Sequence, residues 1–254
     1  MSSSVQTARL IIDPPHEGAV NMAIDQAILE TTAATGQPTL RFYRWSPATL
    51  SLGYFQKFAD RERHSASKEC PIIRRASGGG AIVHDDELTY SLCLATKGLI
   101  AKANTELYDI VHIAIRTALA EQGIAVELYE APDGEAVKAS KADPFLCFER
   151  RAVGDIICDG AKVGGSAQRR LKNALIQHGS LLLSQTDVAP ELPGLKENSG
   201  IEPDVDLLIA EVTKRLGSAL ELEFSKDEVS DSELKRAEEI AQEKFASEEW
   251  TTRR

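Results

Sequence analysis

The sequence predicts an α/β fold of the α+β kind, with a mixed, largely antiparallel sheet and flanking helices. Strand-like and helix-like segments alternate irregularly, and several strands come in hairpin-like pairs, which excludes a regular doubly wound parallel sheet. The 254 residues are 43% hydrophobic and 27% charged, as in ordinary soluble globular proteins. A chain of this length buries roughly 70–75% of its unfolded surface, so it needs no metal or disulfide to hold a core.

The first elements follow from hydrophobic spacing and turn residues. Residues 18–35 carry apolar side chains at helical spacing, and Gly36 ends the predicted helix. Short strands precede and follow the turn at Ser46-Pro47. Residues 71–96 predict a strand, a glycine turn and a further strand pair.

The second half repeats this mixture of elements. Residues 104–122 predict an amphipathic helix, and Gly123 closes it. Residues 131–145 are small, polar and proline-containing, so they predict a surface loop or lid. Further strands are expected at 125–129, 153–158, 163–169 and 174–183, and an irregular connector at 190–206.

The last segment differs in composition from the rest. Between Lys226 and Arg254, 15 of 29 residues are charged, and the apolar residues lie on one helix face. This predicts a solvated helix over 226–254, packed on the same domain as residues 1–225. No linker or internal repeat divides the chain, so no separate accessory domain is expected.

Charge and cysteine content exclude several classes of function. The formal net charge is −10, which argues against a nucleic-acid-binding protein, since phosphate contacts need a basic surface. The four cysteines form no CxxC pair and the histidines have no zinc-like spacing, so no metal site is expected. The N-terminal residues have no basic region followed by an apolar run, so we expect no signal peptide there, and no apolar run approaches the ~20 residues of a membrane span. We expect a reduced, cytoplasmic protein without membrane or nucleic-acid partners.

A glycine-rich segment is the first candidate site. Arg74 and Arg75 are followed by Ser77 and by the glycines 78–80. Consecutive glycines let the backbone approach a ligand and present N–H groups to it, and the arginines add charge for a carboxylate or phosphate. The pattern matches neither the dinucleotide-binding nor the Walker motif. The alternative is a flexible hairpin turn without a ligand.

A second glycine-rich segment also lies beside cations. From Gly160 to Thr186 there is no acidic residue, whereas Lys162 and three further cations are present: Arg169, Arg170 and Lys172. An acidic chain that concentrates cations and glycines in two places suggests one anion-binding cleft built from both. The alternative is a solvated basic hairpin.

A thiol and two histidines complete the candidates. Cys147 follows the polar loop, and a reactive thiol needs neighbouring cations and some exposure. His84 and His178 could supply a base, as in a Cys-His hydrolase. Equally, Cys147 could be structural and both histidines could be hydrogen-bonded structural residues.

Several blocks together resemble the lipoate-protein ligase/octanoyltransferase family. The blocks, in collinear order over nearly the whole chain, are NMAID (21–25), PTLRFYRW (38–45), LSLGYFQ (50–56), IRRASGGGAIVHDDELTYS (73–91), KVGGSAQR (162–169), QHGS (177–180) and KFASEEW (244–250). The resemblance implies a class II synthetase/biotin-ligase type of catalytic domain.

The resemblance also implies site residues. It places an acyl chain and its activated carbonyl between the glycine hairpin and the Lys162 strand, with Cys147 and Lys162 as the catalytic pair. Tyr43, Trp45 and Leu52 are expected in the wall of the chain pocket. The substrate-binding residues it implies are Arg74, Arg75, Ser77, Gly78, Gly79, Gly80, His84, Gly165, Ser166, Ala167 and His178.

Within this family, the chain is most similar to the LipM-type octanoyltransferases. The run from His84 to Ser91 and the position of Cys147 upstream of Lys162 indicate this branch. The resemblance implies transfer of an octanoyl or lipoyl group from acyl carrier protein, through a cysteine thioester, to a lysine of a lipoyl domain or glycine-cleavage H protein. No cofactor is expected for transfer.

Two alternatives remain. An ATP-dependent lipoate-protein ligase would form a lipoyl-adenylate and would need ATP and magnesium, with Cys147 incidental. A non-catalytic acyl-binding module would keep the pocket without turnover, although the presence of both Cys147 and Lys162 argues against it.

Overall fold

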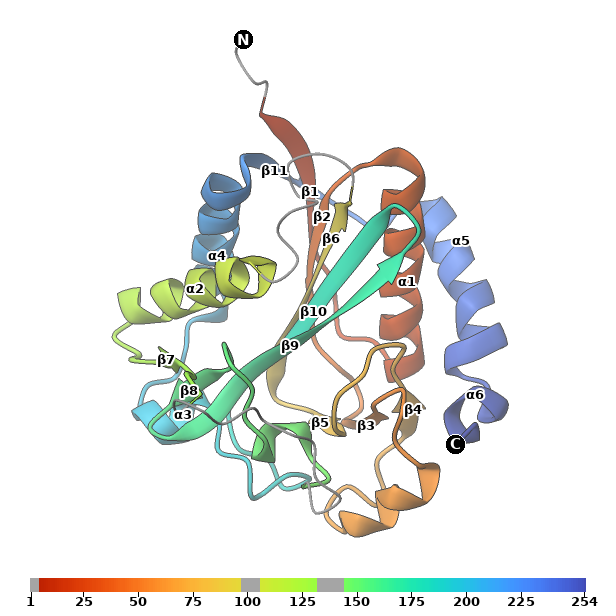
Figure 1. Cartoon of the computed structure of the whole chain (residues 1–254), viewed down its shortest axis with the longest axis vertical. Coiled ribbons are helices and arrows are strands. Elements are labelled where there is room, and N and C mark those ends of the chain that lie inside the picture. The colour runs from red at the N-terminus through yellow and green to blue at the C-terminus, as the bar shows by residue number, and fades with distance from the viewer. Residues whose placement is uncertain (1–4, 97–105, 132–143) are drawn as a thin grey trace.

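The computed structural model describes residues 5–96, 106–131 and 144–254, so most of the loop expected at 131–145 lies outside the described residues. Its main elements form a large sheet with helices on both faces (Figure 1). In chain order they are β1 (Gln6–Ile12), α1 (Gly18–Thr35), β2 (Thr39–Tyr43), β3 (Thr49–Leu52), the 3₁₀ helix Phe58–Arg63, β4 (Ile72–Arg74), β5 (Ile82–His84), β6 (Glu87–Ala95), α2 (Glu106–Glu121), β7 (Glu127–Leu128), the 3₁₀ turn Cys147–Glu149, β8 (Ile156–Cys158), β9 (Ala161–Leu171), β10 (Ala174–Leu182), α3 (Leu195–Ser199), α4 (Val205–Leu220), β11 (Leu222–Asp227), α5 (Asp231–Ile240), the π-helical turn Ala241–Phe245 and α6 (Glu248–Thr252).

The predicted fold class is confirmed. The large sheet has the strand order β11-β1-β2-β6-β10-β9-β8-β7, and only the β11-β1 and β1-β2 pairs are parallel. All other neighbours in it are antiparallel. A small sheet, β4-β3-β5, stands beside it. The long β9-β10 hairpin crosses the molecule and carries the second glycine-rich segment (Figure 1).

Helices cover both faces of the sheet (Figure 1). On one face α2 and α4 bury a row of aliphatic residues, among them Val111 and Leu216, against β6 and β10. On the other face α1 packs with α5 and the π-helical turn, where Phe245 is buried. A third apolar cluster lies between the small sheet and the segment around Phe148. These layers fix the strands that carry the site.

No strand was predicted at β1 or β11 and no helix at α4; β11 is an edge strand of the large sheet, and β1 lies between β11 and β2. β1 and β11 pair in parallel with each other, so neither has a hairpin turn to mark it. α4 begins at the Asp204 cap, inside the segment expected to be an irregular connector. The strand expected at 125–129 is reduced to two residues, Glu127 and Leu128.

The charged tail is not one continuous helix. α5 begins with a capping box between Ser230 and Glu233, and a π-helical turn separates it from α6. Arg9 of β1 binds the Glu233 carboxylate at 2.7 Å, which joins the tail to the sheet. The division of the chain at residue 225 stays a prediction, and β11 runs across it.

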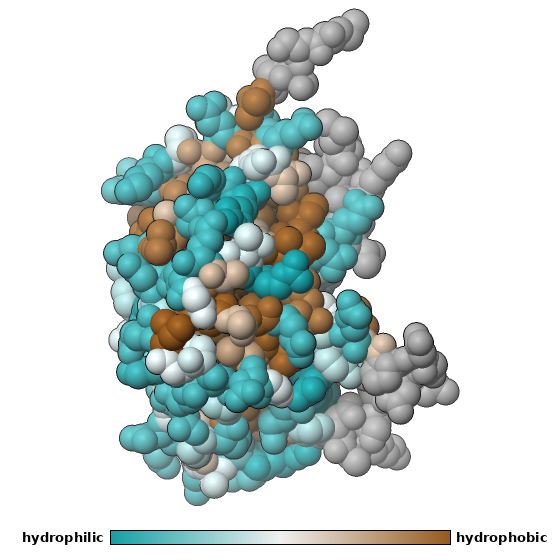
Figure 2. Space-filling view, turned by 90° about the vertical axis from the view of Figure 1, so that its left-hand side faces the viewer, coloured by the Kyte–Doolittle hydropathy of each residue, from teal (hydrophilic) through white to brown (hydrophobic). Residues whose placement is uncertain are grey.

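The side of the molecule that carries α2 and α4 faces the viewer in Figure 2, where hydrophobic residues gather across the middle between hydrophilic areas. Ile113 of α2 and Leu207 of α4 are exposed large hydrophobic residues. Scattered exposure of this kind is normal for globular proteins. Within the described residues, none of the helices combines the length and apolar character needed to cross a membrane.

Candidate active site

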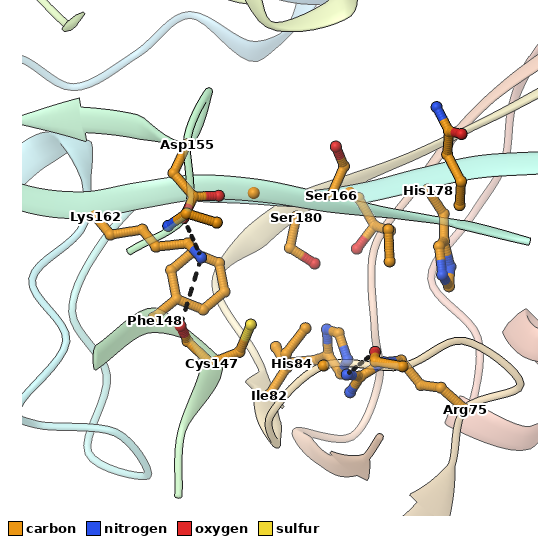
Figure 3. Close-up of a pocket in the computed structure, with 18 of the residues that line it drawn as sticks. Arg75, Ile82, His84, Cys147, Phe148, Asp155, Lys162, Ser166, His178 and Ser180 are labelled. Atoms are coloured by element: carbon orange, nitrogen blue, oxygen red, sulfur yellow. Dashed lines mark hydrogen bonds and ion pairs between the residues drawn. The ribbon is translucent and has the colours of Figure 1, made fainter. Parts of the chain in front are cut away.

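An open cavity of about 390 Å³ lies between the β9-β10 hairpin, the glycine-rich loop and the turn at Cys147. Figure 3 shows Lys162, Asp155 and Phe148 on one side of it and His84, Arg75 and His178 on the other, with Cys147 between them. Ten of the predicted site residues line it, namely Arg75, Gly78, Gly79, His84, Cys147, Lys162, Gly165, Ser166, Ala167 and His178. The structure therefore brings together most of the residues that the sequence pointed to.

Backbone contacts hold Cys147 against the glycine-rich loop. Its amide donates to the Ala81 carbonyl at 2.7 Å, and the Ala81 amide donates to Phe145 at 3.0 Å. A Cβ atom on Gly80 would lie 3.0 Å from the Cys147 nitrogen, so only glycine allows this approach. The side chain of Cys147 is half-buried, and its sulfur points into the cavity between Phe148 and Ile82 (Figure 3). The other three cysteines are buried.

Lys162 reaches the same place from β9. Its Nζ lies 2.7 Å from Asp155 Oδ2 and 3.4 Å from the main-chain oxygen of Cys147. The side chains of Lys162 and Asp155 are only 6% and 8% exposed, so this ion pair is almost fully removed from water. The ammonium is thus fixed beside the residue that carries the thiol, through a hydrogen bond to its carbonyl.

Gly165 of β9 leaves room for this pair. A Cβ atom on Gly165 would lie 2.9 Å from Lys162 Cε and 3.0 Å from Asp155 Oδ1. The side chain of any other residue would push the ammonium away from its carboxylate. The glycine at this position is therefore explained by the packing of the ion pair rather than by a turn.

Arg75 braces the glycine-rich loop from inside the protein. It donates to the Gly80 carbonyl at 2.7 Å and to Ser51 Oγ at 2.6 Å. Burial lowers the pKa of Arg75, and the neighbouring Cys147 acts in the opposite direction because a thiolate there would favour the charged guanidinium. Arg75 thus supplies positive charge near the thiol.

His84 is held by a chain of hydrogen bonds. Its Nδ1 lies 2.8 Å from Glu87 Oε1 and its Nε2 lies 2.6 Å from Ser51 Oγ. Burial lowers the pKa of His84, so the ring is neutral near pH 7, with Nδ1–H donating to the carboxylate. Its face stacks on Trp45 with ring centroids 3.7 Å apart. Both nitrogens are occupied within the protein, and the ring contributes a wall of the cavity.

His178 is also hydrogen-bonded within the protein, next to the glycine-rich loop. Its Nε2 lies 2.7 Å from Ser77 Oγ, and burial lowers its pKa to about 4. The imidazole is therefore neutral in the physiological range. Ser77 itself lines a small neighbouring cavity that it shares with His178 and Arg169.

Four predicted residues do not line this cavity, namely Arg74, Ser77, Gly80 and Leu52. Arg74 is fully buried, and its guanidinium donates to the carbonyls of Gly53, Gln56 and Thr251. Arg74 was expected to contact the substrate. Its guanidinium instead binds main-chain oxygens of the protein, so its role is structural. Leu52, expected in the pocket wall, belongs to a buried apolar cluster, whereas Tyr43 and Trp45 do line the cavity.

Sequence reasoning did not single out Asp155 or His112. Asp155 lies directly before β8, and no cluster of charges or motif in the sequence indicates it as a site residue. His112 lies on the buried face of α2, where it accepts a hydrogen bond from Ser166 Oγ at 2.8 Å while its Nδ1 bonds the Gly154 carbonyl at 2.6 Å. A buried histidine on an apolar helix face is a signal that could have found it. This contact orients the Ser166 hydroxyl toward α2.

The cavity combines apolar and reactive side chains. Met22, Tyr43, Trp45 and Ile82 offer hydrocarbon and aromatic surface to it, and Cys147 and the Lys162-Asp155 pair line the same cavity. Such a site can hold a short apolar chain with a polar carbonyl beside the thiol. Over the described ranges, no group of three or more metal-ligating side chains gathers.

Comparisons with known proteins identify the family of the chain. The family model for the lipoyl protein ligase A/B catalytic domain matches residues 17–193. Octanoyltransferase LipM of Brevibacillus brevis is 33% identical over 273 residues, covering 97% of this chain and 99% of the relative. Further relatives with the same name are 29–38% identical.

Solved structures of low identity share the fold. The putative lipoate protein ligase Ta0514 of T. acidophilum, determined with bound lipoic acid, superimposes with a TM-score of 0.76 at 21% identity, over 97% of this chain and 100% of that one. A bipartite lipoate protein ligase of Thermoplasma acidophilum, studied with its E2 lipoyl domain, gives a TM-score of 0.75 at 19% identity, over 97% and 96% of the two chains.

Proposed function

The chain belongs to the lipoyl protein ligase A/B catalytic family and is an octanoyltransferase of protein lipoylation, and we propose that it works through an acyl thioester on Cys147. The proposed donor is an octanoyl group on acyl carrier protein. The proposed acceptor is a lysine of a lipoyl domain or of glycine-cleavage H protein. The observation that supports the thioester is the half-exposed sulfur of Cys147, which points into the cavity beside a buried ammonium.

In the first step the Cys147 thiolate attacks the thioester carbonyl of the donor. A bond forms between Sγ and the acyl carbon, the bond from that carbon to the donor sulfur breaks, and the proton of the Cys147 thiol ends on the leaving sulfur. Lys162 and Arg75 supply positive charge around the thiol. In the proposed step the Lys162 ammonium stabilises the oxyanion that develops on the acyl carbonyl.

In the second step the acceptor lysine, as a free amine, attacks the acyl-enzyme. A carbon–nitrogen bond forms, the bond from the acyl carbon to Sγ breaks, and the extra proton of the amine returns to the thiolate. Dividing the transfer in this way lets one cavity serve two large protein substrates in turn. Meanwhile the octanoyl chain stays on the apolar wall formed by Tyr43 and Trp45.

This route consumes no ATP, because the donor thioester is already activated. The ligase alternative would require ATP and magnesium to form a lipoyl-adenylate. For the acceptor, the support is the solved ligase that was studied with its E2 lipoyl domain and shares this fold.

The experiment that tests the proposal is mass spectrometry of the intact protein after incubation with octanoyl-acyl carrier protein. We expect an octanoyl adduct that maps to Cys147 and disappears when a lipoyl domain is added. Cys147→Ala should form no adduct and transfer nothing, whereas Cys158→Ala, a buried cysteine on β8, should behave as the parent. A Cys147→Ala protein that still modifies the acceptor, or modification that needs only lipoate, ATP and magnesium, would replace this mechanism by the ligase one.

A further inference from the structure

Four cations and three aromatic rings form a cluster on the outer side of the glycine-rich loop. We call this set, Arg169, Lys244, Arg253 and Arg254 with Tyr54, Phe55 and Trp250, the cation–aromatic cluster. Arg253 lies 4.5 Å from the Tyr54 ring and 4.6 Å from the Trp250 ring, and Lys244 lies 4.6 Å from the same Trp250 ring. Arg254 lies 5.3 Å from the Phe55 ring.

The positive charges of this cluster repel one another. Among the residues that the structure describes, no ion pair involves any of the four, although the chain carries a net charge of −10. Burial, with the charges of Arg169 and Arg253, lowers the pKa of Lys244 to about 8. Glu30, a carboxylate whose charge acts on Lys244, is bound by Arg236 at 2.8 Å. A bound anion would relieve the repulsion.

The cluster adjoins the catalytic cavity. The Phe55 ring covers Gly78, where an added Cβ would lie 3.9 Å from it, and Gly78 lines the catalytic cavity. Arg169 of the cluster also lines a small cavity, together with Ser77 and His178. A ligand that extends from the Cys147 sulfur past the glycine-rich loop would therefore meet the cluster.

From this placement we propose that the cation–aromatic cluster binds the phosphate ester of the donor's pantetheine arm. The inference rests on the proposed function, because it gives a binding site to the phosphate end of the donor whose acyl end reaches Cys147. Guanidinium groups present several donors in a plane and suit phosphate oxygens well. The aromatic rings hold the guanidinium groups in place and so reduce the conformational freedom lost on binding.

The elements that build this cluster lie far apart in the sequence. Arg169 belongs to β9, Tyr54 and Phe55 follow β3, and the remaining members come from the C-terminal segment. The sequence predicted an anion-binding cleft that includes Arg74, Arg75 and Lys162, but two of these cations are bound within the protein. Lys162 is paired with Asp155 and Arg74 with carbonyls, so only Arg169 of the second basic segment enters the cluster.

The test compares three octanoyl donors on the double variant Arg253→Ala/Arg254→Ala. The donors are octanoyl-acyl carrier protein, octanoyl-4′-phosphopantetheine and octanoyl-pantetheine, which lacks the phosphate. We expect kcat/KM to fall about tenfold or more for the two phosphate-bearing donors and to stay unchanged for octanoyl-pantetheine. The matched control is Arg170→Ala/Lys172→Ala, whose side chains are exposed and of which Arg170 projects from β9 to the side opposite Arg169. It should behave as the parent with all three donors.

Other outcomes separate the possibilities. Equal losses for all three donors, or no loss for any, would overturn the phosphate assignment. A loss confined to lipoate with ATP would assign the cluster to nucleotide phosphates and would also overturn it. Arg169→Gln with calorimetric titration by 4′-phosphopantetheine gives a second measurement, in which binding weaker than that of the parent is expected and equal binding contradicts the proposal. If Cys147→Ala still transfers octanoate, the proposed function fails instead, whatever the donor comparison shows.

Discussion

Lys162 Nζ hydrogen-bonds the main-chain oxygen of Cys147 at 3.4 Å, while its charge is paired with Asp155 at 2.7 Å. The ammonium therefore fixes the backbone of the residue that carries the thiol and brings positive charge to the same end of the cavity. Because the pair is nearly excluded from water, its electrostatic effect on the cavity is screened less than that of a surface pair.

Loss of the Asp155 carboxylate should destabilise the protein. Asp155→Ala leaves a buried ammonium without its partner, and removing one member of a buried pair costs about 3–5 kcal/mol of unfolding free energy. Urea denaturation measures the difference. The control is Glu202→Ala, which removes the exposed partner of Lys196 and should cost less than about 1 kcal/mol. Equal effects in the two variants would contradict the importance of the buried pair.

A methyl group in the glycine-rich loop should act through Cys147. Gly80→Ala places a Cβ 3.0 Å from the Cys147 nitrogen, so the backbone that carries the nucleophile must shift, and kcat should fall by roughly tenfold. Gly78→Ala meets only the Phe55 ring at 3.9 Å, which is ordinary contact, so a much smaller change is expected. Steady-state kinetics of octanoyl transfer compares them. The same loss in both variants would mean that the loop needs glycine for another reason.

Alkylation should distinguish Cys147 from the other thiols. Cys70, Cys93 and Cys158 are buried, and burial raises the pKa of each, so little reactive thiolate forms there. Brief treatment with iodoacetamide at neutral pH, followed by peptide mass spectrometry, should label Cys147 first. In Lys162→Met the labelling should slow, since a neutral side chain replaces the ammonium. Unchanged labelling kinetics would remove Lys162 from activation of the thiol.

Acidification should destabilise the fold through His178. Its pKa is about 4 in the folded protein against 6.5 for an unperturbed histidine, so the unfolded chain binds more protons between these values. The contribution of His178 is complete above pH 6.5 and is lost as the pH falls toward 4, by roughly 3 kcal/mol. Urea denaturation at several pH values should show a shallower decline for His178→Gln than for the parent. The same decline in His178→Gln and in the parent would contradict this role of His178.

Local patterns determined much of the fold. The spacing in α1 and α2, the glycines that end them and the hairpin strands β9 and β10 were all predicted. β1 and β11 were not predicted, because parallel pairing joins segments far apart in the chain and leaves no turn between them. The helix α4 was not predicted either. The charged tail gave a helical period but no sign of the π-helical turn that divides it.

The same division holds for the site. The sequence by itself predicted one site built from two glycine-rich segments with cations, a cysteine and two histidines. The family resemblance then named most residues of the cavity. Only the tertiary structure determined the partner of each cationic side chain. Lys162 is bound to Asp155 and Arg74 to main-chain oxygens, whereas Arg169 lies beside cations from the C-terminal segment. The physical reason is that a charge acts over a few ångströms in space, and the partners that neutralise it or leave it open to a ligand come from elements that only folding brings together.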